Sequence, residues 1–155
     1  MQRILFILLA IASVGAGVMF YHYNQADFVT LDNNKYTFKQ LKGDYIVINY
    51  FAEWCAPCLK EVPELSDFNE SKPDNVHLFA VSYDNVSAEK LTELKSKYDM
   101  RFSLIKELKV DLPFQRPSFL PATFILNGEG QVAKELFGEV SSEQLQSIIR
   151  DLNDA

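Results

Sequence analysis

Two cysteines, separated by only two residues, constrain this chain more than any other feature. Cys55 and Cys58 are its only cysteines, and they lie between the apolar run Tyr45–Phe51 and a helix-like run at 59–69. This order predicts a buried strand, a turn that carries both sulfurs, and then a helix. The unpaired N–H groups and the positive dipole end of a helix favour a thiolate in its first turn. The pattern therefore indicates thiol redox chemistry, in which Cys55 attacks a substrate and Cys58 resolves the mixed disulfide.

Half of a zinc site is the alternative interpretation of the cysteine pair. Structural zinc takes four protein ligands. Only His22 and His77 could join the cysteines, and neither has ligand spacing. We therefore expect neither a metal nor another cofactor, and His77 is interpreted as a packed residue of a strand.

Length and charge exclude other classes of protein. A chain of 155 residues with 48% hydrophobic content suits one domain with a sizeable core. The formal net charge is −6 and no basic cluster is present, so we expect no nucleic-acid partner.

The N-terminus has the character of a membrane segment. After Arg3, residues 4–20 carry no charge, and Tyr21 and Tyr23 follow them. Such a run is near the lower limit of about 17–25 residues for a spanning helix, and tyrosines suit a membrane interface. A cleaved signal peptide, with a weak small-residue site at 14–16, is the alternative. Apolar residues continue past that site to Phe20, which favours an uncleaved anchor.

Either interpretation places the cysteines outside the cytoplasm, where disulfides persist. We divide the chain into a membrane anchor at 1–23, a polar linker at 24–27 and one domain at 28–155.

Apolar periodicity, turn residues and helix caps predict the remaining elements. A strand at 76–83 should run parallel to Tyr45–Phe51 through a right-handed crossover. Pro63 should kink the helix after the cysteines. Pro113 and Pro117 argue against a long helix at 106–119. The other expected elements are short strands at 28–31 and 36–38, a strand or loop at 102–105, a hairpin of 122–126 and 131–137, and helices capped by Ser87 and Ser141.

The cysteine segment carries a family resemblance. Residues 51–58 read FAEWCAPC and resemble the active-site segment of thioredoxins. The longer pattern, from NYFA at 49–52 to CLKEVP at 58–63, is closer to the membrane-anchored TlpA-like, or ResA-like, thiol–disulfide oxidoreductases. The resemblance covers residues 28–149. It implies a thioredoxin-like α/β fold, with a central mixed sheet flanked by helices on both faces, and a redox-active disulfide between Cys55 and Cys58.

A second landmark of the family is a proline with a cis peptide bond at the start of a strand. Leu120 and Pro121 match it. In the family this proline faces the cysteine pair, so the backbone of Leu120 is expected to pair with an extended substrate. A trans proline that opens an edge strand is the alternative. Trp54 and Pro57 are expected to shape access to the sulfurs.

The buried acid of thioredoxins has no direct counterpart here. Its position is taken by Asn49, which cannot titrate. Glu61 follows Cys58 by three residues on roughly the same helix face, where a shielded carboxylate with a raised pKa could take the Cys58 proton. A solvated surface glutamate beside Lys60 is the alternative interpretation of Glu61.

The resemblance also implies a function. It predicts reduction of protein disulfides, for example of cysteines awaiting haem attachment in c-type cytochromes, at the outer, periplasmic face of a bacterial cytoplasmic membrane. A membrane thiol–disulfide carrier would re-reduce the protein. A disulfide-forming oxidase and a binding or metal-delivery module of the same fold are the alternatives; the peroxidatic Thr-X-X-Cys pattern is absent. The family commonly has a longer helical passage where this chain has residues 106–119, which leaves the substrate open.

Overall fold

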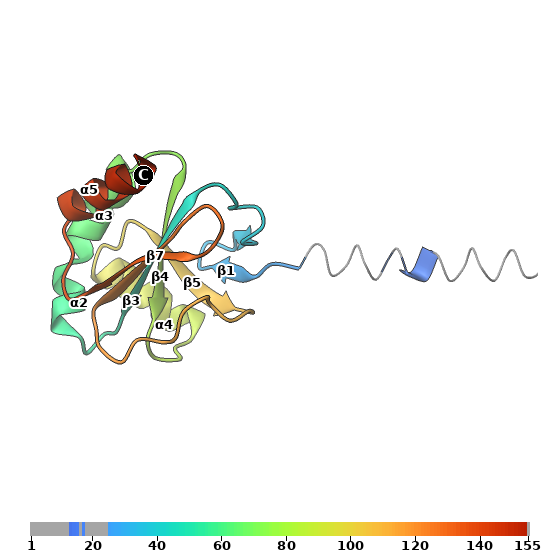
Figure 1. Ribbon diagram of the computed structural model, residues 1–155. Helices are drawn as coiled ribbons and strands as arrows, with labels where there is room; N and C mark the ends of the chain where they lie inside the picture. The colour runs from blue at the N-terminus through green and yellow to red at the C-terminus, as the bar shows by residue number, and fades with distance from the viewer. Residues whose placement is uncertain (1–12, 16, 18–24, 155) are drawn as a thin grey trace, which may run out of the picture.

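The structure is a computed structural model that describes residues 13–15, 17 and 25–154 (Figure 1). Most of the expected anchor at 1–23 lies outside the described residues. No helix within the described part of the chain is long and apolar enough to cross a membrane.

Seven strands of the described residues form one sheet in the order β2-β1-β5-β4-β3-β6-β7. The strand β3 pairs in parallel with β4, and β4 with β5, whereas the remaining neighbours are antiparallel. The predicted mixed sheet is thus confirmed. The strands are β1 (Phe28–Thr30), β2 (Lys35–Tyr36), β3 (Tyr45–Phe51), β4 (Val76–Ser82), β5 (Ser103–Leu108), β6 (Ala122–Leu126) and β7 (Val132–Phe137).

The central strand β3 has the bounds that its sequence predicts. Its residues after Tyr45 are all buried, because β4 and β6 flank it and both of its faces are covered. The predicted parallel crossover to β4 is confirmed, and Tyr45 lies opposite Val76.

The described helices outside the N-terminal segment are α2 (Ala56–Lys60), α3 (Val62–Ser71), α4 (Ala88–Lys97) and α5 (Ser142–Asn153). The predicted caps of α4 and α5 are confirmed. Ser87 Oγ accepts the Lys90 N–H at 3.3 Å, and Ser141 Oγ accepts the Gln144 N–H at 3.1 Å. Each cap satisfies a backbone donor that the first turn of a helix leaves without a partner.

The expected kink at Pro63 is a helix boundary instead. The helix α2 ends at Lys60, Glu61 caps both helices, and Pro63 is the second residue of α3. Proline has no N–H and its ring clashes with the carbonyl four residues earlier, so it fits the first turn of a new helix better than the interior of one long helix. The boundary places Glu61 between two helices.

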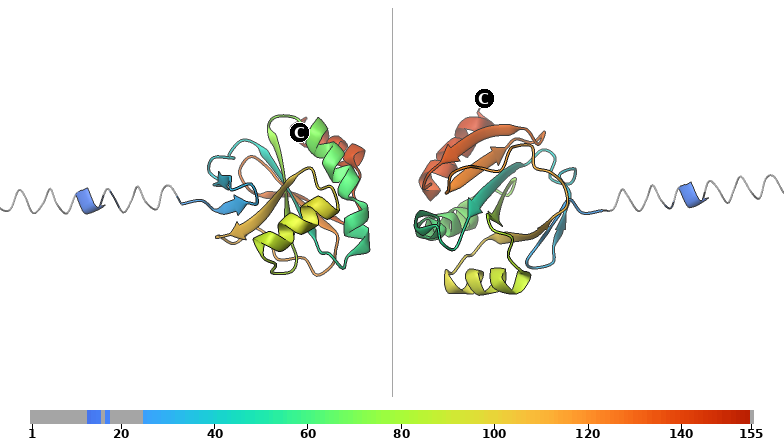
Figure 2. Two further views of the ribbon diagram at one scale, coloured as in Figure 1. Left: turned by 180° about the vertical axis from the view of Figure 1, so that it is seen from behind. Right: turned by 90° about the horizontal axis from the view of Figure 1, so that it is seen from below.

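The helices α2 to α5 lie on one face of the sheet, which corrects the expectation of helices on both faces (Figure 2). Their buried residues share one core cluster with Val47 and Leu78, whereas the cluster around Ile46 and Ile48 contains no residue of these helices. Two successive right-handed crossovers in one direction, β3 to β4 to β5, place α3 and α4 on the same face.

The other face is covered by loops. The chain returns from β5 to β6 through residues 109–121 without a helix, consistent with Pro113 and Pro117 in this stretch. From this loop Leu112 and Phe114 pack against the second cluster, together with Leu41 of the loop after β2. We call residues 109–121 the crossover loop.

Candidate active site

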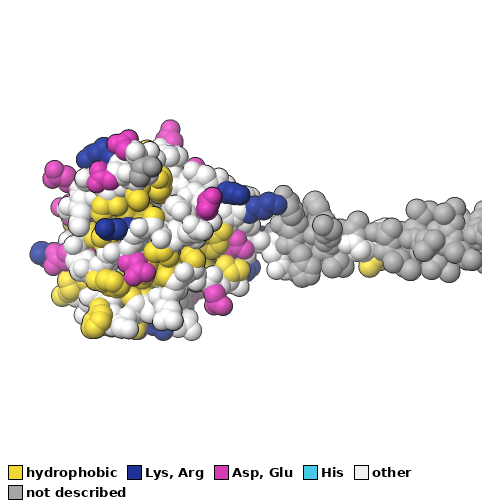
Figure 3. Space-filling view, viewed as in Figure 1, with side chains coloured by type: hydrophobic (Ala, Val, Ile, Leu, Met, Phe, Trp, Pro, Cys, Tyr) yellow, Lys and Arg dark blue, Asp and Glu magenta, His cyan; other side chains and the backbone are white. Residues whose placement is uncertain are grey.

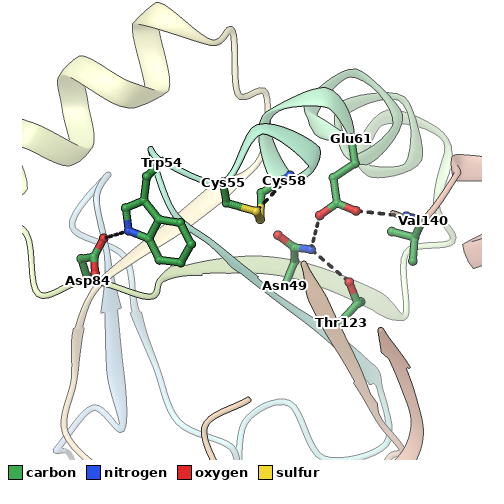
Figure 4. Close-up of a disulfide and its surroundings, with 8 residues drawn as sticks. All are labelled: Asn49, Trp54, Cys55, Cys58, Glu61, Asp84, Thr123 and Val140. Atoms are coloured by element: carbon green, nitrogen blue, oxygen red, sulfur yellow. Dashed lines mark hydrogen bonds between the residues drawn. A yellow bond between two sulfur atoms is a disulfide. The ribbon is translucent and has the colours of Figure 1, made fainter. Parts of the chain in front are cut away.

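Cys55 and Cys58 form a disulfide at the start of α2 (Figure 4). Their Cα atoms are 5.3 Å apart. Cys55 is the N-cap residue, and its Sγ accepts the N–H of Cys58 at 3.3 Å. Pro57 lies in the first turn, where its missing N–H is not needed. Cys55 is 5% exposed and Cys58 only 1%, so the first sulfur is the more accessible of the two.

The peptide bond between Leu120 and Pro121 is cis, which confirms the expected backbone geometry. β6 begins at the next residue and runs antiparallel to β3, with Tyr50 opposite Ala122. Because β3 leads into Cys55 and β6 begins just after Pro121, the proline and the disulfide lie at the same end of the sheet.

The carboxylate of Glu61 is buried behind the disulfide, so the interpretation as a surface residue is wrong (Figure 4). Glu61 Oε1 accepts a hydrogen bond from Asn49 Nδ2 at 2.8 Å, and Oε2 accepts the Val140 N–H at 3.0 Å. Asn49 Nδ2 also donates to Thr123 Oγ1 at 3.0 Å. Asn49 therefore holds Glu61 from the position where thioredoxins have their acid.

Burial raises the pKa of Glu61 from its ordinary value of 4.5 to about 7. The hydrogen bonds from Asn49 and Val140 stabilise the charged form and lower the pKa, and the nearby charge of Glu139 raises it again. A carboxyl group with this pKa exchanges a proton near neutral pH, which is the property that an acid–base group needs.

Trp54 immediately precedes Cys55, and its exposed side chain contacts residues that follow β4. Its side chain is 65% exposed, and its Nε1–H donates to Asp84 Oδ2 at 2.7 Å. The Trp54 ring meets the Tyr83 ring edge-on, with centroids 6.2 Å apart. Arg116 of the crossover loop lies 3.8 Å from the Tyr83 ring centroid and donates to the Tyr83 carbonyl. Tertiary folding brings these residues together, and no local sequence pattern marked Asp84 or Arg116.

His77 and Glu53 both have structural partners. His77 Nε2 lies 2.8 Å from Asp44 Oδ2, in keeping with its interpretation as a packed strand residue. Glu53 pairs with Lys90 at 3.0 Å and with Lys97 at 3.2 Å. Among the described residues, no group of three or more His, Cys, Asp or Glu side chains is placed to hold a metal ion.

A cysteine pair at a helix start, beside a cis proline at the end of a mixed sheet, defines a thioredoxin-like site for thiol–disulfide exchange. Comparison with known proteins agrees with this class. The model of the AhpC/TSA family matches residues 22–135, and the chain belongs to this family.

The chain aligns over most of its length with two named relatives. A thiol-disulfide oxidoreductase ResA of Bacillus cereus is 27% identical over 125 residues, which cover 79% of this chain and 71% of that protein. The sporulation thiol-disulfide oxidoreductase A of Bacillus subtilis (strain 168) is 29% identical over 117 residues, which cover 68% of this chain and 66% of that protein. With the Cys55–Cys58 pair, these relatives identify a thiol–disulfide oxidoreductase.

Solved structures confirm the thioredoxin-like α/β fold. StoA from Bacillus subtilis superposes with a TM-score of 0.63 at 22% identity, over 77% of this chain and 92% of that one. A DsbF homologue from Corynebacterium diphtheriae gives a TM-score of 0.66 at 19% identity, over 81% and 82% of the two chains.

Proposed function

We propose that the protein reduces disulfide bonds of other proteins outside the cytoplasmic membrane, through Cys55 and Cys58. The observation that carries the proposal is the disulfide at the start of α2, with the buried carboxyl of Glu61 behind it. The names of the relatives, thiol-disulfide oxidoreductases, support the reaction class.

The reaction begins from the reduced protein. The thiolate of Cys55 attacks one sulfur of a substrate disulfide, which forms a mixed disulfide and releases the other substrate sulfur as a thiol after protonation. Cys58 then loses its proton and attacks the Cys55 sulfur. This step forms the Cys55–Cys58 disulfide and releases the second substrate thiol. Two electrons pass from the protein to its substrate, and a membrane thiol–disulfide carrier is the donor that would restore the dithiol.

The geometry favours Cys55 as the attacking sulfur. Cys55 is the more exposed cysteine, and the Cys58 N–H that its sulfur accepts would stabilise a thiolate there. Cys58, 1% exposed, lies behind it and is placed to resolve the mixed disulfide.

Glu61 is the proposed proton acceptor for Cys58. It follows Cys58 by one helical turn, and its pKa of about 7 leaves part of the population ionised at neutral pH. Trp54, Pro57, Leu120 and Pro121 are proposed to bind the substrate around the sulfurs, with the Leu120 backbone pairing with an extended chain.

The direction of electron flow is tested by the reduction potential of the cysteine pair. A potential near that of thioredoxin, about −270 mV, supports a reductant, and one near about −120 mV supports a disulfide-forming oxidase. Replacement of both cysteines provides the second test. Loss of substrate binding, rather than loss of turnover, would favour a binding or metal-delivery module.

Location outside the membrane is part of the proposal. It rests on the uncharged residues 4–20, on the linker at 24–27 and on the domain at 28–155, whose first strand begins at Phe28. Cysteines awaiting haem attachment in c-type cytochromes are one example of a substrate that the family resemblance implies there. The protein should stay in the membrane fraction after carbonate washing. External protease should digest its domain, because the domain faces outward. A soluble mature form that starts near Gly17 would refute the anchor and leave export standing.

A further inference from the structure

Three aromatic side chains are exposed near the reactive end of the sheet. Trp54, Phe119 and Phe137 are 65%, 75% and 59% exposed. Trp54 immediately precedes Cys55, and Phe119 immediately precedes the Leu120–Pro121 cis peptide. Phe137 lies opposite Ala122, which follows Pro121. Large exposed aromatic residues that gather at one place usually mark a binding surface.

Two of these side chains, Phe119 and Phe137, border a groove of about 780 Å³ between the crossover loop and the strands β6 and β7. Within the groove Phe114 stacks on Phe124, with ring centroids 3.8 Å apart and planes 4° apart. Phe137 meets Phe124 edge-on, with centroids 6.3 Å apart. We call this site the aromatic groove. Figure 3 shows hydrophobic side chains spread across the middle and lower left of the face on which β7 lies in Figure 1.

The groove is open because the crossover loop passes over this face without a helix. A helix packed on this face would cover Phe124 with a continuous apolar stripe. The loop instead contributes one stacked ring, from Phe114, and leaves Phe119 and Phe137 uncovered.

We propose that the aromatic groove binds an apolar side chain, aromatic or large aliphatic, that flanks the cysteine of an extended substrate polypeptide. The inference rests on the proposed function and names the substrate class of the same site. Phe119, which lines the groove, immediately precedes Leu120, whose backbone would pair with the substrate. Alternate side chains of a paired strand point to the same face, so a side chain near the substrate cysteine would enter the groove.

The charges at the groove favour a polypeptide over a membrane surface. Arg116 and Glu135 both line it, so its margin carries both signs of charge. A polar rim around an apolar centre is the usual anatomy of a protein interface. Membrane-binding faces are instead rich in basic residues on an amphipathic helix, and this chain has a net charge of −6.

The test uses the full chain in detergent and two disulfide-bonded peptides that differ only in one residue beside the cysteine, Phe or Ser. The kcat/KM of the reduced wild type should be about tenfold higher for the Phe peptide than for the Ser peptide, a difference equivalent to about 1.4 kcal/mol. Phe119→Ser and Phe137→Ser should each abolish most of this preference. Phe119→Leu should retain it. Val110→Ser is the matched control, because Val110 is an exposed apolar residue of the same loop that does not line the groove.

Glutathione disulfide separates the two levels of the proposal, because it has no apolar side chain to place in the groove. Equal rates for the two peptides, or a preference that survives both serine variants, would overturn the groove while reduction of glutathione disulfide continues. If the wild type reduces neither the two peptides nor glutathione disulfide, the proposed function itself fails. Two other results would also overturn the groove as a substrate site. In both, the serine variants leave the peptide kinetics unchanged. They abolish either self-association of the protein or its binding to neutral phospholipid vesicles.

Discussion

Replacement of Glu61 by glutamine should change how the stability of the oxidised protein depends on pH. Burial raises the pKa of Glu61 from 4.5 to about 7. Between these two values the folded protein keeps a proton that the unfolded chain has lost, so the free energy of unfolding falls as pH rises. The contribution is fully present below pH 4.5 and lost as pH rises through about 7. Since one pH unit corresponds to about 1.4 kcal/mol, the total loss is about 3 kcal/mol.

The amide introduced by Glu61→Gln would not titrate, so the variant should lack this loss. It should also carry a penalty that does not depend on pH. Each carboxyl oxygen has its own donor, Asn49 Nδ2 or the Val140 N–H, whereas the amide replaces one of these oxygens with an NH2 group that cannot accept a hydrogen bond. A buried donor left without a partner costs about 1–3 kcal/mol. The variant should therefore be less stable than the wild type at pH 5, and the difference should shrink or reverse by pH 8.

Urea unfolding of both oxidised proteins at pH 5, 6, 7 and 8, followed by circular dichroism, measures this difference. The disulfide keeps Cys55 and Cys58 from titrating over the same range. The free energy of the wild type relative to the variant should fall by about 2–3 kcal/mol from pH 5 to pH 8. A difference that stays constant within about 1 kcal/mol, or that changes in the opposite direction, would refute a raised pKa at Glu61. In the reduced protein, the variant should also slow reduction of a protein disulfide; unchanged rates from pH 6 to pH 9 would leave proton transfer to water.

Two further outcomes concern the same site, and a third concerns the cap of α5. Cys58→Ser should accumulate covalent complexes with substrates on non-reducing gels and Cys55→Ser few, because only the resolving step is lost; equal trapping by both variants would reverse the two roles. Asn49→Ala removes a hydrogen bond that lowers the pKa of Glu61, so the pH midpoint of the Glu61 stability effect should move upward from about 7, and a downward shift would contradict the assignment. Ser141→Ala should lower the free energy of unfolding by about 1 kcal/mol in the same urea experiment through loss of the α5 cap, and no change would show that the cap is dispensable.

The parts of the fold that the sequence predicted well depend on local signals. A seven-residue apolar run defined β3, because a strand covered on both faces needs apolar side chains throughout. Ser87 and Ser141 marked helix starts, because each side chain satisfies a donor within its own helix. The family resemblance, rather than any local energy, led to the cis bond at Pro121.

Distant contacts decided what the sequence left open. The burial of Glu61 depends on Val140, 79 residues further along the chain, and on Asn49 of the central strand. No local pattern contains that information, so the buried and the solvated interpretations were equally consistent with the helix face. Helices on both faces were a family expectation. Pro113 and Pro117 argued against a helix between β5 and β6. Which face of the sheet would then lack helices depends on the order of the strands.

Because the crossover loop is not a helix, the residues next to Pro121 can change without loss of the cover over this face of the sheet. A packed helix next to Pro121 would have to keep its length, its apolar stripe and its crossing angle for the sheet to remain covered. A surface loop between the same strands tolerates substitution and changes in length. Residues 113–119 could therefore diverge while α2, with the disulfide, stays unchanged on the opposite layer. Proteins with this fold could acquire new substrates through changes in this one loop. The reduction potential and the proton transfer of their cysteines would not change.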